Sequence, residues 1–184
     1  MTKQNENRRV RMTKQMIKDA LLELLEQKDL KKISVTAICE TADVNRSTFY
    51  KYYTDPIDLL NEIEQDYMDM IPKSTDLPDL IAPEELVKLT SAFFDYVKQN
   101  EKVSRVLFND SVYSHFSSNL VDFIYSGKFV FKEAKDELTS HYYRLYIANG
   151  TVGMLHDWVK NGFPVTSMKI AEMMYSLSNT ITQI

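Results

Sequence analysis

The chain has 184 residues, of which 22 are Lys or Arg and 26 are Asp or Glu, so its formal net charge is −4 at pH 7. A hydrophobic fraction of 44% is enough for a buried core and excludes a disordered chain. Only nine residues are Gly or Pro, and the first glycine is Gly127. This scarcity excludes the many tight turns of a β-sandwich or barrel, and it also excludes a glycine-rich phosphate loop, because Gly150 and Gly153 lack the required spacing.

The charge is unevenly distributed along the chain. Residues 1–53 hold 11 basic and seven acidic residues, a net charge of +4, whereas residues 54–184 hold 11 basic and 19 acidic residues, a net charge of −8. Such asymmetry is typical of a basic contact surface on an acidic protein. The negative net charge of the whole chain argues against a nucleic-acid partner. The positive net charge of residues 1–53 is compatible with one.

The chain also carries signals about its compartment. A single cysteine, Cys39, excludes an internal disulfide and fits a reducing environment. Residues 1–11 are polar, and no apolar run approaches the roughly 18 residues that a membrane span needs. We therefore expect no signal peptide, no membrane partner and a cytoplasmic location.

The N-terminal region begins with a predicted mobile basic arm, residues 1–12, for which an ordinary disordered terminus is the alternative. Thr13 is expected to cap a helix whose apolar residues recur every three or four positions, namely Ile17, Ala20, Leu21, Leu24 and Leu25. Ser34 is a good N-cap for a short second helix. Asn45 is expected to cap a third, over residues 46–52.

The next helix has a strong start signal at Asp55 and Pro56. Proline-rich residues 72–83 indicate a connecting loop, and Pro83 opens a further helix. Two aromatic-rich helices are expected within residues 103–131, a long helix over 138–161, and a last helix capped by Thr166. The sequence thus predicts an all-α fold of about nine helices. Its expected domains are an arm (1–12), a three-helix helix-turn-helix domain (13–55) and an effector-binding and dimerisation domain (56–184).

The spacing of residues 34–53 is that of a helix-turn-helix, and its second helix carries the chemistry that suits DNA. With Phe49 and Tyr53 buried, Arg46, Ser47 and Thr48 stand at the N-terminal end, where recognition helices contact bases. Tyr50 and Lys51 suit phosphate contacts. A polar face on a small helical bundle explains the same pattern, and from the pattern alone the two interpretations are about equal.

Residues 13–60 resemble the N-terminal domain of the TetR family of transcriptional regulators. The matching positions include Ile33 to Ile38, Ala42 to Tyr50, Tyr53, Leu59 and Leu60, and the run Arg46 to Tyr50 is a specific signature. The tail, with Tyr146 to Gly150, Trp158 and Pro164, resembles a C-terminal type found in regulators of dihydroxyacetone kinase operons. The residues expected to contact DNA are Arg9, Arg11, Ser34, Thr36, Asn45, Arg46, Ser47, Thr48, Tyr50, Lys51 and Tyr52.

Two positions depart from the family pattern. Most members have Gly where Asp43 stands, and Asp tolerates the left-handed conformation of such a turn better than most residues. Many members have a phosphate-binding Lys where Pro56 stands. We expect the turn to survive the first change, and the basic arm to matter more because of the second.

The resemblance also implies a homodimer with an effector. The expected dimer interface comprises Gly150, Gly153, Met154, Trp158, Met173, Met174 and Leu177, with packing inside one chain as the alternative. A candidate effector pocket comprises Phe93, Tyr96, Val97, Phe108, Tyr113, Phe116 and Phe123, with a packed aromatic core as the alternative. The effector could be a small molecule or a protein.

Sequence gives no sign of catalysis. His115, His141 and His156 are too widely spaced for a helical metal-ligand pair, so we expect no metal, no cofactor and no enzyme. The predicted function is a dimeric repressor that binds a near-palindromic operator and is released by an effector. The alternatives are an activator controlled by a protein partner and, from another class, a small helical adaptor or enzyme.

Overall fold

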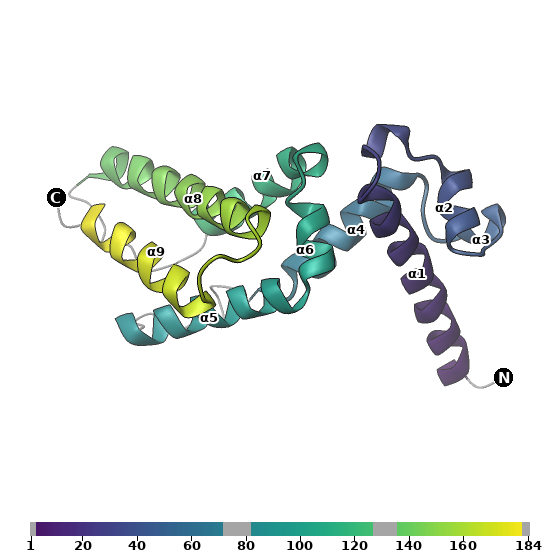
Figure 1. Cartoon of the computed structure of the whole chain (residues 1–184), viewed down its shortest axis with the longest axis horizontal. Coiled ribbons are helices and arrows are strands. Elements are labelled where there is room, and N and C mark those ends of the chain that lie inside the picture. Colours follow the sequence, from purple (N-terminus) through teal and green to yellow (C-terminus); the bar gives the residue numbers. More distant parts are fainter. Residues whose placement is uncertain (1–2, 72–81, 127–135, 182–184) are drawn as a thin grey trace. The chain divides into compact units, whose positions relative to one another are not determined.

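The computed structural model describes residues 3–71, 82–126 and 136–181, which form nine α-helices and one short 3-10 helix and contain no strand (Figure 1). The all-α prediction is therefore confirmed. The chain divides into two compact units, Met1–Asp69 and Met70–Ile184. Each unit has a hydrophobic core of its own.

The first unit consists of α1 (Lys3–Leu25), the 3-10 turn η1 (Leu30–Lys32), α2 (Val35–Thr41), α3 (Arg46–Tyr50) and α4 (Pro56–Met68). Helix α1 packs against α2 and α4, and α2 packs against α3. The wholly buried side chains at the centre of this unit are Ile17, Leu21, Ile38, Phe49 and Leu59. They follow the helical spacing of the sequence, so the apolar periodicity placed the core correctly.

Helix α1 begins at Lys3, eleven residues before the predicted start that follows a cap at Thr13. Thr13 lies inside the helix, where its hydroxyl donates to the Arg9 carbonyl at 3.0 Å instead of capping a first turn. The reason is local: residues 3–12 contain no Gly or Pro and several strong helix formers, so nothing stops the helix. The basic arm is thus helical, and Arg8, Arg9 and Arg11 are exposed on it.

The predicted caps hold at three helices. The Ser34 hydroxyl accepts from the Ala37 N–H at 3.2 Å, and the Asp55 carboxylate accepts from two N–H groups of α4 at 2.8 and 2.9 Å. The Thr166 hydroxyl accepts from the Lys169 N–H at 3.2 Å. Asn45 takes the cap position of α3, but its side chain accepts no hydrogen bond from the described backbone.

The second unit consists of α5 (Pro83–Gln99), α6 (Glu101–Leu107), α7 (Asp110–Ser126), α8 (Glu137–Lys160) and α9 (Ser167–Ile181). Helix α5 packs along α9, and α7 packs against α8. Gly127, where we expect the second of the aromatic-rich helices to end, lies outside the described residues. The largest buried side chains of this unit are Phe94, Phe116 and Trp158.

Helix α4 groups with the first unit in this division, because it packs against α1. The functional boundary between residues 55 and 56 stays a prediction. No described helix has both the length and the apolar composition needed to cross a membrane.

Candidate nucleic-acid interface

The turn between α2 and α3 depends on the backbone of Asp43, which has a φ of 51°. The Val44 N–H donates to the Cys39 carbonyl at 3.0 Å, and the Asp43 N–H donates to the Glu40 carbonyl at 3.4 Å. This pair of bonds is the Schellman pattern that closes a helix end on a left-handed residue. Asp43 thus takes the conformation expected for the position where most family members have Gly.

The inner face of α3 is anchored by Phe49, which is fully buried. Its ring contacts Tyr50 edge-on with centroids 5.6 Å apart, and contacts Tyr53 at 5.7 Å. Tyr53 is itself 2% exposed. This apolar anchor fixes the rotation of the short helix and leaves its opposite face to the surface.

The outer face of α3 carries the residue types that contact DNA. Arg46, Ser47 and Lys51 are exposed, Tyr50 is 51% exposed, and Thr48 and Tyr52 are half-buried. The Arg46 guanidinium lies 5.9 Å from the centroid of the Tyr50 ring. A hydrogen bond and an electrostatic interaction with the Tyr50 side chain raise the pKa of Arg46.

The other predicted contacts lie on the same unit. Ser34 and Thr36 are exposed at the start of α2, and Asn45 is exposed before α3. The Lys51 ammonium lies 5.8 Å from the Tyr52 ring centroid. Arg9 and Arg11 are exposed on α1. Whether these residues bind DNA stays a prediction, but each described side chain is accessible to a ligand.

An ion-pair cluster between α1 and α4 was not foreseen. The Glu62 carboxylate lies 2.6 Å from both Lys14 and Lys18, and Lys18 also lies 2.5 Å from Asp66. The Tyr53 hydroxyl donates to Glu62 at 3.2 Å. The available signal was a matched spacing, because the lysines and the carboxylates are each four residues apart and so each pair shares one helix face.

The ion-pair cluster shifts the pKa values of Glu62 and Lys18. Burial alone would raise the pKa of Glu62, but hydrogen bonds from Lys14 and Lys18 outweigh it and hold the pKa below its usual value. Burial alone would lower the pKa of Lys18, but bonds to Asp66 and Glu62 outweigh it and raise the pKa. Glu62 and Lys18 therefore both stay charged at neutral pH.

The positive net charge of residues 1–53 does not extend over the whole first unit. Residues 1–69 hold 11 basic and 13 acidic residues, a net charge of −2 rather than a basic excess. The difference comes from residues 54–69, which add six carboxylates and no basic residue. Two of those carboxylates bind Lys14 and Lys18, whereas Arg46 and Lys51 are exposed on or beside α3.

The predicted dimer residues fall into two groups. Gly150 and Gly153 are exposed, and a Cβ placed on either would have no neighbour within 4 Å outside the backbone of its own helix. Met173 and Leu177 are also exposed, at 42% and 54%, and Met154 is half-buried. These five positions are available to a partner on the surface of the protomer.

Trp158 and Met174 are different, because they are 2% and 6% exposed and belong to the core of their own chain. The Trp158 Nε1–H donates to the Val165 carbonyl at 2.9 Å, and its ring contacts Phe94 and Phe163. Apolar residues cover most of the circumference of α8. The sequence pattern therefore did not distinguish Trp158, which faces the core of its own chain, from a residue that faces a partner.

The predicted aromatic pocket consists in part of packed side chains. Val97, Phe108 and Phe116 are buried, and the rings of Phe108 and Phe116 meet edge-on with centroids 5.3 Å apart. Phe93, Tyr96 and Phe123 are half-buried, and the side chain of Tyr113 lies outside the described residues. An effector pocket here stays a prediction, and the close ring contact supports the packed-core alternative.

Among the described side chains, no group of three or more His, Cys, Asp or Glu residues could hold a metal ion. Cys39 is 4% exposed within α2, as a core residue. Burial raises the pKa of its thiol, which disfavours the reactive thiolate.

Comparison with known proteins places this geometry in a family. The family model TetR_C_8, described as a transcriptional regulator C-terminal region, matches residues 84–180. A stretch of 58 residues is 33% identical to the uncharacterized HTH-type transcriptional regulator YxbF of Bacillus subtilis (strain 168). That stretch is 32% of this chain and 15% of the relative, so the match spans a small part of the longer protein.

Solved structures show the same fold. A TetR transcriptional regulator from Streptococcus agalactiae 2603V has a TM-score of 0.68 at 19% identity, covering 96% of this chain and 99% of that one. The dihydroxyacetone kinase operon activator DhaS has a TM-score of 0.61 at 18% identity, covering 93% and 96%. The resemblance predicted from the sequence is confirmed.

Proposed function

The chain belongs to the TetR family of transcriptional regulators, and we propose that it binds a near-palindromic operator as a homodimer and acts as a repressor that an effector releases. The observation that carries DNA binding is the exposed face of α3 beside a well-formed turn. Arg46 is exposed there above a buried Phe49, as recognition by the N-terminal end of a helix requires. A regulator of this kind acts where the DNA is, in the cytoplasm.

The proposed contacts follow from side-chain chemistry. Arg46 suits the O6 and N7 atoms of guanine, and Ser47 and Thr48 suit several base edges. Lys51 and Tyr50 suit phosphates, as do Arg9 and Arg11 on the helical arm. Phosphate contacts supply salt-dependent affinity, and the contacts to bases supply sequence preference.

The dimer proposal is supported by an uncovered face of α8. Its exposed apolar residues recur at helical spacing, and the glycines continue the same face: Leu138 (66% exposed), Tyr142 (59%), Tyr146 (67%), Gly150 and Gly153. Helix α9 adds Met173 and Leu177. Exposed apolar surface of this kind marks an interface, and small residues let a second helix approach closely. A two-fold dimer would present two copies of α3 to the two half-sites of an operator.

Activation is the second candidate for the sign of regulation. One fold neighbour is named an operon activator. A protein effector suits this candidate, because the predicted aromatic pocket is packed at Phe108 and Phe116. The effector would act by favouring one dimer geometry over another.

Selection from a random duplex pool tests the proposed function. The full chain should enrich one near-palindromic sequence, and it should bind that duplex about 10³-fold or more tightly than an unrelated one at physiological salt. Failure to enrich any sequence, or equal affinity for both duplexes, would contradict the proposal.

A further inference from the structure

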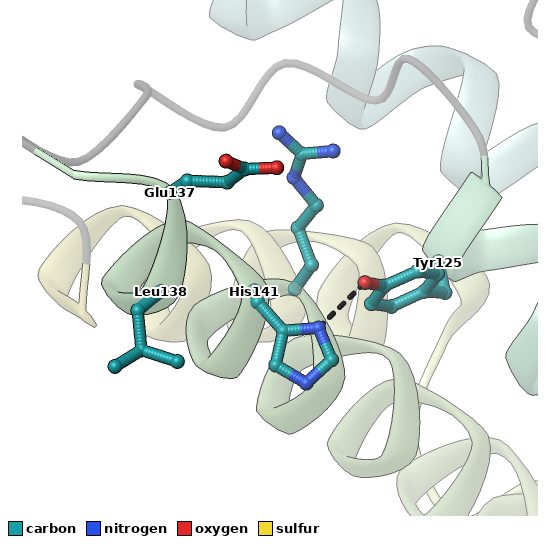
Figure 2. Close-up of a pocket in the computed structure, with 5 residues that line it drawn as sticks. Tyr125, Glu137, Leu138 and His141 are labelled. Atoms are coloured by element: carbon teal, nitrogen blue, oxygen red, sulfur yellow. Dashed lines mark hydrogen bonds between the residues drawn. The ribbon is translucent and has the colours of Figure 1, made fainter.

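A pocket in the second unit lies where the end of α7 meets the start of α8 (Figure 2). This open hollow of about 530 Å³ is lined by Tyr125, Glu137, Leu138, His141 and Arg144. Its size falls in the range of small-molecule sites. It shares no residue with the predicted aromatic pocket, and Leu138 at its rim also belongs to the exposed apolar face of α8 that supports the dimer proposal.

The residues that line the pocket belong to two regular helices, so the backbone positions from which their side chains extend are fixed. Helices α7 and α8 pack against each other. The Asp136 carboxylate caps α8 by accepting from the Thr139 N–H at 2.9 Å and from the Thr139 hydroxyl at 2.8 Å. The first turn, which carries Glu137 and Leu138, is therefore held in place.

One side of the pocket is a paired Tyr125 and His141. The phenol oxygen lies 2.7 Å from Nδ1 of the imidazole, and the two rings are nearly perpendicular with centroids 5.8 Å apart (Figure 2). This hydrogen bond ties the end of α7 to the start of α8 and so fixes the wall of the pocket.

Two charged residues, Arg144 and Glu137, line the pocket. Arg144 is half-buried, and Glu137 is exposed at the rim. Neither residue forms an ion pair with the other or with any side chain in the described part of the chain. A half-buried guanidinium favours an anion, and its planar fork matches the two oxygens of a carboxylate.

We propose that this pocket binds a small carboxylate that also carries a hydroxyl or amino group. Arg144 binds the carboxylate, and Glu137 accepts a hydrogen bond from the second group. The negative charge of Glu137 disfavours inorganic phosphate, which at neutral pH carries more negative charge than a monocarboxylate. Leu138, which is 66% exposed, contacts the carbon skeleton of the ligand.

The test is calorimetric titration of the full chain, without DNA, with glycerate, serine, propionate and inorganic phosphate. Glycerate or serine should bind with a Kd of about 1 mM or tighter, and propionate and phosphate about tenfold more weakly. Arg144→Gln and Arg144→Lys should each weaken the better ligand at least about tenfold, because both remove the bidentate fork. Glu137→Gln should weaken that ligand relative to propionate, because the second group loses its charged acceptor and propionate has no such group.

Lys102→Gln, at an exposed position on α6, is the matched control and should change nothing. Circular dichroism checks that each variant is folded, and Glu137→Gln, at an exposed position, serves in place of an Arg144 variant that is not. The inference fails if neither glycerate nor serine binds, if phosphate binds as tightly as they do, or if the folded pocket variants bind like the native chain. Because no DNA is present, this outcome is independent of the proposed function.

Discussion

Lys18 of α1 and Asp66 of α4 form an ion pair with 2.5 Å between Nζ and Oδ2. Glu62, one turn earlier on α4, binds Lys18 and also Lys14. These contacts hold α1 against α4, which are the first and the last helix of the first unit along the chain. Lys14 and Lys18 both contribute to the positive charge of residues 1–53, but their ammonium groups are paired with carboxylates of α4.

The cluster predicts how stability depends on pH. The pKa of Glu62 is lowered in the folded chain, so its contribution is complete above its unfolded pKa and is lost as pH falls through the folded one. The pKa of Lys18 is raised, so its contribution is complete below its unfolded pKa and is lost as pH rises through the folded one.

Glu62→Gln should therefore lower the free energy of unfolding by about 1 kcal/mol at pH 7, and the deficit should vanish in acid. Urea unfolding at neutral pH and below the carboxylate range measures this. Glu26→Gln, at an exposed position on the same unit, should cost little at either pH. An equal deficit for Glu62→Gln at both pH values would show that the charge contributes nothing.

The ion-pair cluster predicts which lysines contribute to DNA binding and which do not. Lys51→Ala should weaken binding to every DNA sequence and reduce the salt slope by about 1, because an exposed phosphate contact is lost. Lys14→Gln should leave the slope almost unchanged, because its ammonium is held by Glu62 at 2.6 Å. Fluorescence anisotropy over a range of salt compares the two variants. Equal loss of slope would show that Lys14 also reaches the phosphates.

The left-handed turn at Asp43 predicts a stabilising substitution. A non-glycine residue in this conformation costs about 1–2 kcal/mol, less for Asp, so Asp43→Gly should raise the free energy of unfolding by about 0.5–1 kcal/mol. Asp43→Val should lower it, because a β-branched side chain tolerates a positive φ poorly. Urea unfolding of the full chain measures both, and a destabilised Asp43→Gly would contradict the account of the turn.

The glycines of α8 allow dimerisation to be tested without harming the fold. A Cβ at Gly150 meets no neighbour in the protomer, and Leu favours helix over Gly by about 1 kcal/mol. Gly150→Leu should therefore keep or raise the stability of the protomer and yet give monomers by light scattering. Lys102→Leu is the control and should stay dimeric. A dimeric Gly150→Leu would place the interface elsewhere.

Local signals were enough to predict the candidate DNA-binding region. Ser34 and Asp55 cap their helices through residues two or three positions away, and Phe49 is buried as its helical spacing predicts. The conformation of Asp43 followed from the resemblance and from the chemistry of Asp. Each of these features depends on residues close together in the chain.

The features that sequence missed depend on distant partners or on a missing stop signal. Helix α1 continues to Lys3 because nothing before Thr13 breaks it. Lys18 and Asp66 are 48 residues apart, so only the fold pairs them. Trp158 lies on a helix that is apolar far round its circumference, and the packing of Phe94 and Phe163 decides that it faces inward.

Base recognition by Arg46 is the central claim, and anisotropy with two duplexes tests it most directly. One duplex is the sequence enriched by the full chain, and the other is unrelated. Arg46→Ala should weaken binding to the enriched duplex by about 1–3 kcal/mol and relax its sequence preference, while binding to the unrelated duplex changes far less. Equal loss on both duplexes would contradict base recognition by Arg46 and reduce it to a phosphate contact.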